Sequence, residues 1–437
     1  MLALALVALT DEFWSGVAVV AAPEVEREQR IEHGAYALLV FALPMLGSAV
    51  LEAGLALVAD RYPRRRVAGL GLLAMSLALV LCALAPDGPA LAIGLALAGA
   101  ASGVACAAAQ GELVTTTPDG GARAMTRWVL FGSLGDVLTP LVVAVLLSAG
   151  GSYRAAFIAA AALAFLQGGL LVAGGWRGRG AEEALAPCEE PLVAREEPLA
   201  QAVEGAGRPG GDIAVGEVAS GDNAVGEVAV GEVASGDTAE PDPEEAEALP
   251  LLQALREGVR NGPLWRWLIA ASLCTFLDEI VVAFAALHAE GDLGASAATA
   301  VACVSGVSAG AVLGAWVTDR LLGAVAPDRL LFGSTLVTLL TLGAVVLAPS
   351  PSWLALALVG LGASAAPQYA LAKAKAYAAS PGRPGVVNAL AQVFVLVDIV
   401  GPLALGVLAD RFGVGVAIAC LVVQPLGVLG LLLGSRR

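Results

Sequence analysis

Twelve apolar segments of about 20 residues divide this chain, and they leave few alternatives for its fold. A helix of roughly 20 residues crosses the hydrocarbon core of a bilayer, where every backbone N–H and C=O group must be paired within the protein. The chain is therefore predicted to be an all-α integral membrane protein with 12 transmembrane helices. The predicted spans are 2–22, 34–58, 66–86, 89–113, 125–148, 154–175, 264–288, 296–317, 329–348, 352–375, 385–409 and 413–433.

The composition agrees with this class. Hydrophobic residues make up 58% of the chain and the mean hydropathy is +0.80, which is too apolar for a soluble protein of 437 residues. The formal net charge of −15 comes almost entirely from residues 177–262, which hold 19 acidic residues against 6 arginines. The acidity thus belongs to one solvated stretch, and it argues against nucleic acid as a partner.

The acidic stretch is of low complexity. Residues 214–219 are repeated at 224–229, and such a composition cannot bury enough apolar surface to build a core. We predict a disordered cytoplasmic loop at 177–262, between an N-terminal six-helix half, 1–176, and a C-terminal six-helix half, 263–437.

The two predicted halves carry matching polar landmarks in the same order. The first and seventh apolar segments each hold two adjacent acids near the middle, and three further landmarks follow. The matched sets are Asp11-Glu12 with Asp278-Glu279, Asp60-Arg61 with Asp319-Arg320, Gln110 with Gln368, and Asp136 with Asp398. This shared order predicts a duplication, and hence two pseudo-symmetric halves.

Acids in the middle of an apolar segment are the leading candidates for function. A charge at the centre of a membrane helix costs about 2.5–3.5 kcal/mol on insertion scales, so acids kept there usually face water, a substrate or a proton path. Adjacent helical residues point about 100° apart, so Asp11 and Glu12 cannot both face one cavity. We expect one acid of each pair to carry a proton. The other would pair with a neighbouring helix, through Arg127 or a serine, or lie in a polar wall. The alternative is that all these acids only hydrogen-bond between helices.

The basic residues predict the orientation. If the loop containing Asp60 is cytoplasmic, 18 Lys and Arg residues near the helices lie on that side. The four on the opposite side are Arg27, Arg30, Arg154 and Arg411. The positive-inside rule then places both termini and the long loop in the cytoplasm, with the protein in the inner membrane. Lys373 and Lys375 lie at the inner end of a predicted helix, and we interpret them as snorkelling at the interface, with attraction of an anionic substrate as the alternative.

A charged motif follows the second apolar segment, with the sequence Ala56-Leu57-Val58-Ala59-Asp60-Arg61-Tyr62-Pro63-Arg64-Arg65. It resembles the Gly-x-x-x-Asp-Arg/Lys-x-Gly-Arg-Arg/Lys signature of the major facilitator superfamily of secondary transporters, with Ala56 and Pro63 in place of the two glycines. A degraded copy occurs at 315–320 and a closer one at 406–413. The resemblance covers all twelve predicted helices.

The resemblance implies a rocker-switch carrier. Its first, fourth, seventh and tenth helices would line a central cavity, and its second, fifth, eighth and eleventh would form the interface between the halves. The candidate proton and substrate residues are then Asp11, Glu12, Asp278, Glu279, Gln110 and Gln368 on cavity helices, and Glu52, Asp136 and Asp398 on interface helices. The candidate gating residues are Asp60, Arg61, Arg64, Arg65, Asp319 and Arg320. They would latch the cytoplasmic side by charge pairing, unless the arginines only hold the topology.

These features predict a transporter and not an enzyme. The sequence has no Walker loop, dinucleotide fingerprint or nucleophile–base constellation, and its cysteines lack the spacing of a zinc site, so we expect no cofactor and no metal. We expect a monomeric secondary active transporter that couples export of a small cationic or neutral organic solute to protons, by antiport. Gly132, Gly135 and Pro140 faintly resemble the Gly-Pro motif of drug–proton antiporters, and the chain is also similar to fosmidomycin-resistance-type exporters. The alternatives are an uptake carrier for a sugar or organic anion and a non-transporting membrane sensor or scaffold.

Overall fold

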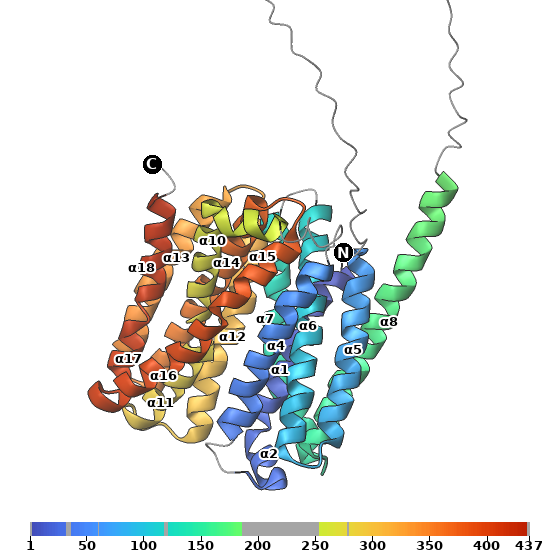
Figure 1. Ribbon diagram of the computed structural model, residues 1–437. Helices are drawn as coiled ribbons and strands as arrows, with labels where there is room; N and C mark the ends of the chain where they lie inside the picture. Colours follow the sequence, from blue (N-terminus) through green and yellow to red (C-terminus); the bar gives the residue numbers. More distant parts are fainter. Residues whose placement is uncertain are drawn as a thin grey trace, which may run out of the picture.

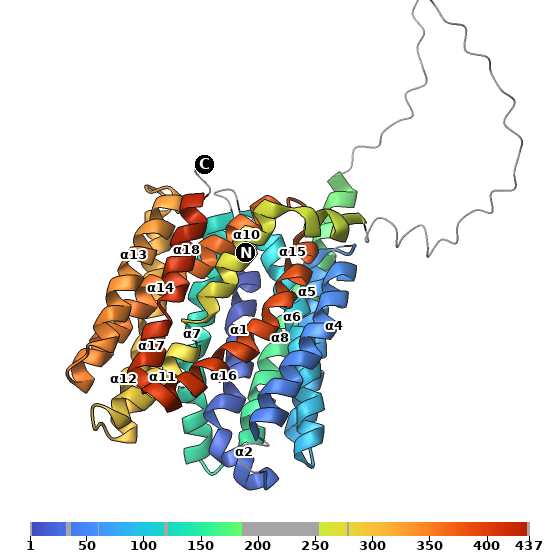
Figure 2. The same cartoon turned by 60° about the vertical axis from the view of Figure 1, so that its left-hand side comes forward.

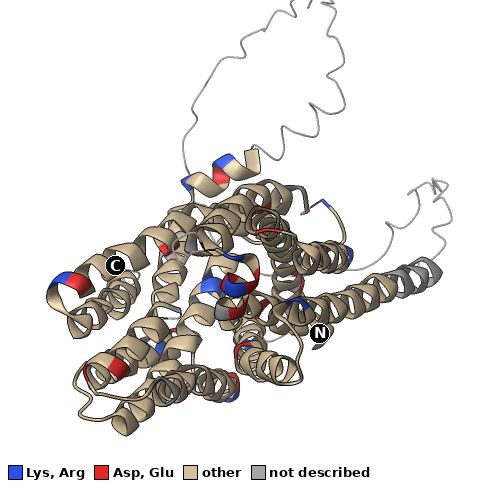
Figure 3. Cartoon of the chain, turned by 90° about the horizontal axis from the view of Figure 1, so that it is seen from below, with Lys and Arg blue, Asp and Glu red and all other residues tan. Residues whose placement is uncertain are grey.

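The computed structural model describes residues 2–31, 36–59, 61–117, 121–185, 253–277 and 279–434. Within these ranges the chain forms helices joined by short turns, and no β-strand occurs in them. Twelve helical segments are long and apolar enough to cross a membrane. Figure 3 shows that acidic and basic residues occupy few positions on these helices. The predicted all-α membrane architecture with twelve spans is confirmed.

The N-terminal half supplies six of the spans (Figure 1). Its helices are α1 (Leu2–Val20), α2 (Ala22–Gln29), the π-helical η1 (Ala37–Ala42), α4 (Leu43–Ala59), α5 (Arg64–Leu84), α6 (Gly88–Thr116), α7 (Gly121–Ser148) and α8 (Tyr153–Leu185). The short helix α2 is polar and lies at the opposite end of the bundle from the end of α18, and η1 continues into α4 to make one span.

The C-terminal half supplies the other six spans, several of them interrupted. Its helices are α10 (Gly262–Thr275), α11 (Glu279–Gly291), α12 (Ala297–Leu321), α13 (Pro327–Val346), α14 (Pro351–Ala379), α15 (Pro384–Ala391), the 3₁₀ turn η2 (Gln392–Phe394), α16 (Val395–Phe412), α17 (Val414–Cys420) and α18 (Val423–Leu433). The predicted continuous spans 264–288, 385–409 and 413–433 are thus each interrupted.

Four of the long helices begin at a side chain that caps the first turn. In each case the cap accepts a hydrogen bond from the backbone N–H three residues later, which satisfies one of the donors that a helix start leaves unpaired. The caps are Asp87 before α6, Asn261 before α10, Ser296 before α12 and Ser350 before α14. These residues therefore fix where the helices enter the bundle.

The predicted loop at 177–262 is helical at both of its ends. The backbone of α8 continues to Leu185, and residues 253–260 are again helical. This second segment is attached to the C-terminal half, since Asn261 Nδ2 donates to the Ala379 carbonyl at 2.8 Å. Residues 186–252 lie outside the described residues, so the disordered loop and its boundaries stay predictions.

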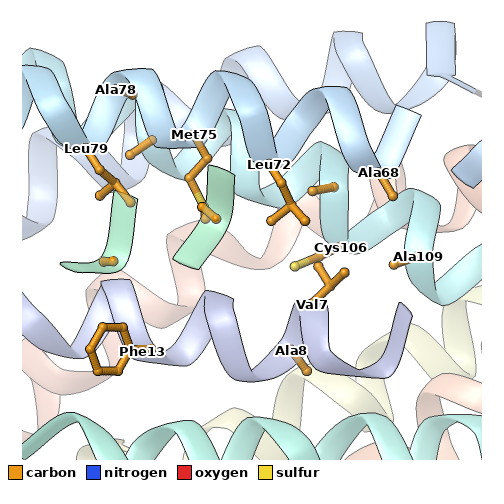
Figure 4. Packing of buried hydrophobic residues seen from close by; sticks show 14 of the residues in the cluster. Val7, Ala8, Phe13, Ala68, Leu72, Met75, Ala78, Leu79, Cys106 and Ala109 are labelled. Atoms are coloured by element: carbon orange, nitrogen blue, oxygen red, sulfur yellow. The ribbon is translucent and has the colours of Figure 1, made fainter. Parts of the chain in front are cut away.

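The core of the N-terminal half forms around α1. Figure 4 shows Val7 of α1 beneath Leu72 of α5, with Cys106 and Ala109 of α6 alongside. Val7 and Leu72 are fully buried, which places α1 inside the bundle rather than at its lipid-facing surface. The acids carried by α1, Asp11 and Glu12, are each partly buried.

Helices α12 and α14 approach each other through glycines. A Cβ atom added at Gly314 of α12 would lie 2.0 Å from the carbonyl oxygen of Ala363, and one added at Gly362 of α14 would lie 2.0 Å from that of Val307. Small residues allow such backbone contact between membrane helices and strengthen their packing. This packing fixes the position of α14, which faces the N-terminal half.

The two halves meet through a small set of helices. Helix α4 contacts α15 on one side, and α7 contacts α12 and α14 on the other. Figures 1 and 2 show the start of α1 and the end of α18 at the same end of the bundle, together with α10 and α15. We call this end, where α4 is followed by α5 and α12 by α13, the loop end.

Candidate functional site

The two adjacent acids of α1 face different helices. Ser102 Oγ of α6 donates to Asp11 Oδ1 at 2.5 Å, and Trp14 Nε1 donates to the same oxygen at 3.1 Å. Glu12 instead lies against α7, where a Cβ atom added at Gly135 would be 2.9 Å from the Glu12 Cβ atom. The 100° spacing of neighbouring helical residues therefore separates them as expected, and a serine is the partner of Asp11.

Glu52 of α4 lies beside Asp11, where the two halves meet. Its Oε2 atom occupies the position that a side chain at Gly103 of α6 would need, because a Cβ atom added there would be 2.1 Å away. Gln392 of η2 hydrogen-bonds to the Glu52 carboxylate, and the charge of Asp11 also acts on it. Glu52 thus reaches from the N-terminal half to the break between α15 and α16.

Gly103→Ala is expected to push the Glu52 carboxylate away from α6 and to weaken its hydrogen bond to Gln392. We expect a loss of stability of about 1 kcal/mol, the usual worth of one hydrogen bond, seen as a lower Tm of the purified protein. The matched control is the same substitution in a Glu52→Ala background, where no carboxylate has to move and Tm should hardly change. Equal losses in both backgrounds would show that Gly103 does not position Glu52.

Lys373 of α14 completes the cluster from the C-terminal half. Its side chain is only 6% exposed, and its Nζ atom lies 5.6 Å from the centre of the Tyr377 ring. The charges of Lys373 and Glu52 act on each other across the interface between the halves. We call Asp11, Glu52, Ser102, Lys373 and Gln392 the central polar cluster.

The snorkelling interpretation is wrong for Lys373, because its side chain is buried instead of reaching water. Lys375, two residues further on, points to a different neighbour: it pairs with Asp328 of α13, and its Nζ atom lies 4.7 Å from the centre of the Trp267 ring. The two lysines therefore have different neighbours, because residues two apart on a helix point to different sides of it.

Gln110 of α6 forms a hydrogen bond between the halves. It accepts from the Tyr377 hydroxyl of α14 at 2.6 Å, and the same hydroxyl lies 3.0 Å from the side-chain oxygen of Asn388. All three residues are buried. Sequence reasoning missed Tyr377, although its place four residues after Lys373 puts both on the same face of α14.

Gln368 was expected on the cavity face, but the structure places it inside the C-terminal half. Its Nε2 atom donates to Thr338 Oγ1 of α13 at 2.6 Å, and its Oε1 atom accepts from Gln424 Nε2 of α18 at 2.8 Å. The side chain is fully buried among these partners. The structure therefore does not bring Gln368 to the central polar cluster.

The remaining candidate acids lie apart from the cluster or outside the described residues. Asp398 of α16 accepts a hydrogen bond from Thr275 Oγ1 of α10 at 2.8 Å, which links two helices of one half. Asp136 is exposed on α7. Asp278 is not among the described residues, and only the backbone of Glu279 is described, so their roles stay predictions.

Two candidate gating residues, Asp319 and Arg64, join the halves at the loop end. Asp319 at the end of α12 pairs with Arg127 of α7, with 3.1 Å between Oδ1 and Nε, and with Arg123 at 3.6 Å. Arg64 of α5 donates to the Gly382 carbonyl at 3.2 Å. Together with the bond between Gln110 and Tyr377, these contacts close the loop end.

Other arginines of the motif make contacts within their own half. Arg65 pairs with Glu112 of α6 at 3.1 Å. The guanidinium of Arg320 lies 5.3 Å from the centre of the Trp316 ring, and Arg61 is exposed. Asp60 lies outside the described residues, so its part in a latch stays a prediction.

Comparison with known proteins agrees with this geometry. A family model described as Major Facilitator Superfamily matches residues 2–397. The chain belongs to the Major Facilitator Superfamily. It is therefore a membrane transporter of a small solute and not an enzyme. No curated protein sequence matches this superfamily member.

Solved transporters share the fold at low sequence identity. The chain is similar to FucP in its outward conformation, with 14% identity, a TM-score of 0.61, and coverage of 99% of this chain and 97% of that one. It is also similar to XylE, a proton:xylose symporter bound to 6-bromo-6-deoxy-D-glucose, with 14% identity, a TM-score of 0.65, and coverage of 99% and 93%. A second FucP structure, described as the E. coli fucose:proton symporter, has 14% identity, a TM-score of 0.64, and coverage of 100% and 98%.

Proposed function

We propose that this superfamily member is a proton-coupled secondary transporter that moves a small organic solute by alternating access, as a monomer. The central polar cluster carries the proposal. Two carboxylates of the N-terminal half, Asp11 and Glu52, lie near each other, and Glu52 interacts with one buried ammonium of the C-terminal half, Lys373. Acids inside a membrane protein are costly unless a cation or a proton neutralises them, so a cluster with more acids than bases provides a place for a proton.

The contacts at the loop end support alternating access. The bonds of Gln110 with Tyr377, of Arg64 with Gly382 and of Asp319 with Arg127 must break before a solute in the cluster can leave at that end. We place the loop end in the cytoplasm of an inner-membrane protein, because the positive-inside rule puts 18 basic residues on that side. These bonds then form the inner gate.

Two forms of coupling fit this site. Export of a cationic or neutral solute in exchange for protons is the form that the sequence predicts. The burial of Lys373 favours a second form, proton-linked uptake of an organic anion, because a buried ammonium attracts a solute of the opposite charge. XylE and FucP are described as proton symporters, and their fold is compatible with the second form.

A test of proton coupling uses the full chain in liposomes that enclose a fluorescent pH indicator. Matched sets of small organic anions, amines and neutral compounds are added outside, and the internal pH is recorded, with protein-free liposomes as the control. We expect at least one solute to change the internal pH in a protein-dependent way. Uptake of a radiolabelled solute without any such pH change would contradict proton coupling.

A further inference from the structure

We propose that Lys373 binds an anionic group of the transported solute and that Glu52 takes up the proton that accompanies it, so that the cargo is an organic anion cotransported with H⁺. This inference rests on the proposed transport function and names the substrate class and the coupling residue. It follows from the surroundings of Lys373 and Glu52 at the interface between the halves.

Lys373 has the features of a binding group. It is the only lysine or arginine that is buried among the residues described by the structure. The hydrogen bonds of the described residues include none from its Nζ atom, although the side chain is more than nine-tenths buried. A buried ammonium ordinarily needs hydrogen-bond acceptors, and here it has only the face of the Tyr377 ring and the charge of Glu52. Its three N–H donors are available to a ligand.

The neighbours of Lys373 hold it close to the contact between the halves. The glycine contacts between α12 and α14 hold its helix, and the hydroxyl of Tyr377, one turn further along α14, is tied to Gln110 of the other half. The ammonium thus lies on the cluster side of the closed gate. A solute bound there would be released towards the loop end only after the Tyr377 bond breaks.

Glu52 is the acid whose electrostatic surroundings change when an anion binds to Lys373. The groups that face it are Asp11 of α1, Cys106 of α6, Gln392 of η2 and Lys373 of α14. Asp11 accepts hydrogen bonds from Ser102 and Trp14. Glu52 instead has a hydrogen bond with Gln392 and an electrostatic interaction with Lys373. A solute anion on Lys373 adds a negative charge beside Glu52, and a proton on Glu52 offsets it. The anion and the proton therefore bind cooperatively, and each raises the affinity for the other by the same factor.

A binding experiment separates this inference from transport. The purified full chain in nanodiscs is titrated with matched probes that differ only in the polar group: butyrate, butylamine and butanol, then benzoate, benzylamine and benzyl alcohol. We expect at least one carboxylate to raise Tm, while its amine and alcohol partners do not. Lys373→Met should weaken that binding by at least about tenfold, as loss of a charged hydrogen bond does, and Lys373→Arg should restore part of it. The control Lys375→Met should bind normally.

The number of protons that bind together with the carboxylate is measured with the same nanodisc preparation. Calorimetric titration of the bound carboxylate in buffers of different ionisation enthalpy should show proton uptake in the wild type and none in Glu52→Gln. The proposal is overturned if no carboxylate binds, if an amine or alcohol binds equally well, if Lys373→Met keeps full affinity, or if proton uptake persists in Glu52→Gln. A proton flux driven only by amines or neutral solutes would leave the proposed function standing and reject this inference alone.

Discussion

Glu52→Gln is expected to abolish solute accumulation driven by a proton gradient while downhill exchange of the solute continues. The glutamine keeps the size of the side chain and its contact with α6 at Gly103, but it cannot bind and release a proton. Exchange needs only binding and the rocking of the halves, so its rate should stay within about a factor of three, a change of less than 1 kcal/mol in the barrier. The measurement is radiolabelled uptake into proteoliposomes with and without a pH gradient.

The matched control is Glu12→Gln. Glu12 is an acid at nearly the same depth as Asp11, but it lies against α7 at Gly132 and Gly135 and not in the central polar cluster. Its neutral variant should therefore keep gradient-driven accumulation. If Glu12→Gln loses accumulation and Glu52→Gln keeps it, the proton travels along α7 and the cluster is not the coupling site.

Asp319→Asn is expected to open the loop end more often. The substitution removes the acid that holds Arg123 and Arg127 of α7 against the end of α12. The ion pairs are partly exposed, so screening by solvent limits their contribution to the stability of the closed state to about 1 kcal/mol. Their loss should therefore raise the population of the open state about fivefold. The readout is the labelling rate of Cys106, a buried thiol of α6 beside the cluster, by a membrane-impermeant maleimide.

This labelling is done in inside-out vesicles with a variant in which Cys106 is the only cysteine. Asp328→Asn is the control, because Asp328 pairs with Lys375 at the same end but within one half. We expect faster labelling only for Asp319→Asn. Equal rates for both variants and the parent would show that the contact between Asp319 and α7 does not gate the site.

The membrane-spanning architecture could be predicted from the sequence because lipid imposes a simple rule on it. Only runs of about 20 apolar residues can cross the bilayer as helices, so hydropathy alone gives twelve spans. The divergence of Asp11 and Glu12 follows equally simply from the geometry of one helix. Neither inference needs knowledge of how the helices pack.

The composition of the site could not be predicted, because it depends on how each helix is rotated. Helix α14 is apolar on most of its surface, so its sequence does not show that Lys373 and Tyr377 face the other half while Gln368 faces α13 and α18. The breaks after Thr275 and at η2 also have no proline or glycine to mark them. Tertiary packing alone decides these features, and it brings Gln392 to Glu52.

Accumulation of the solute under an imposed pH gradient tests the central claim most directly. Proteoliposomes holding the full chain are given a gradient of one pH unit, with the acidic side outside, and the internal and external solute concentrations are compared at steady state. One pH unit corresponds to about 1.4 kcal/mol, so coupling of one proton to one solute molecule should concentrate the solute about tenfold inside, and a protonophore should abolish the difference. Equal concentrations on both sides in the presence of the gradient, with transport otherwise intact, would contradict proton coupling.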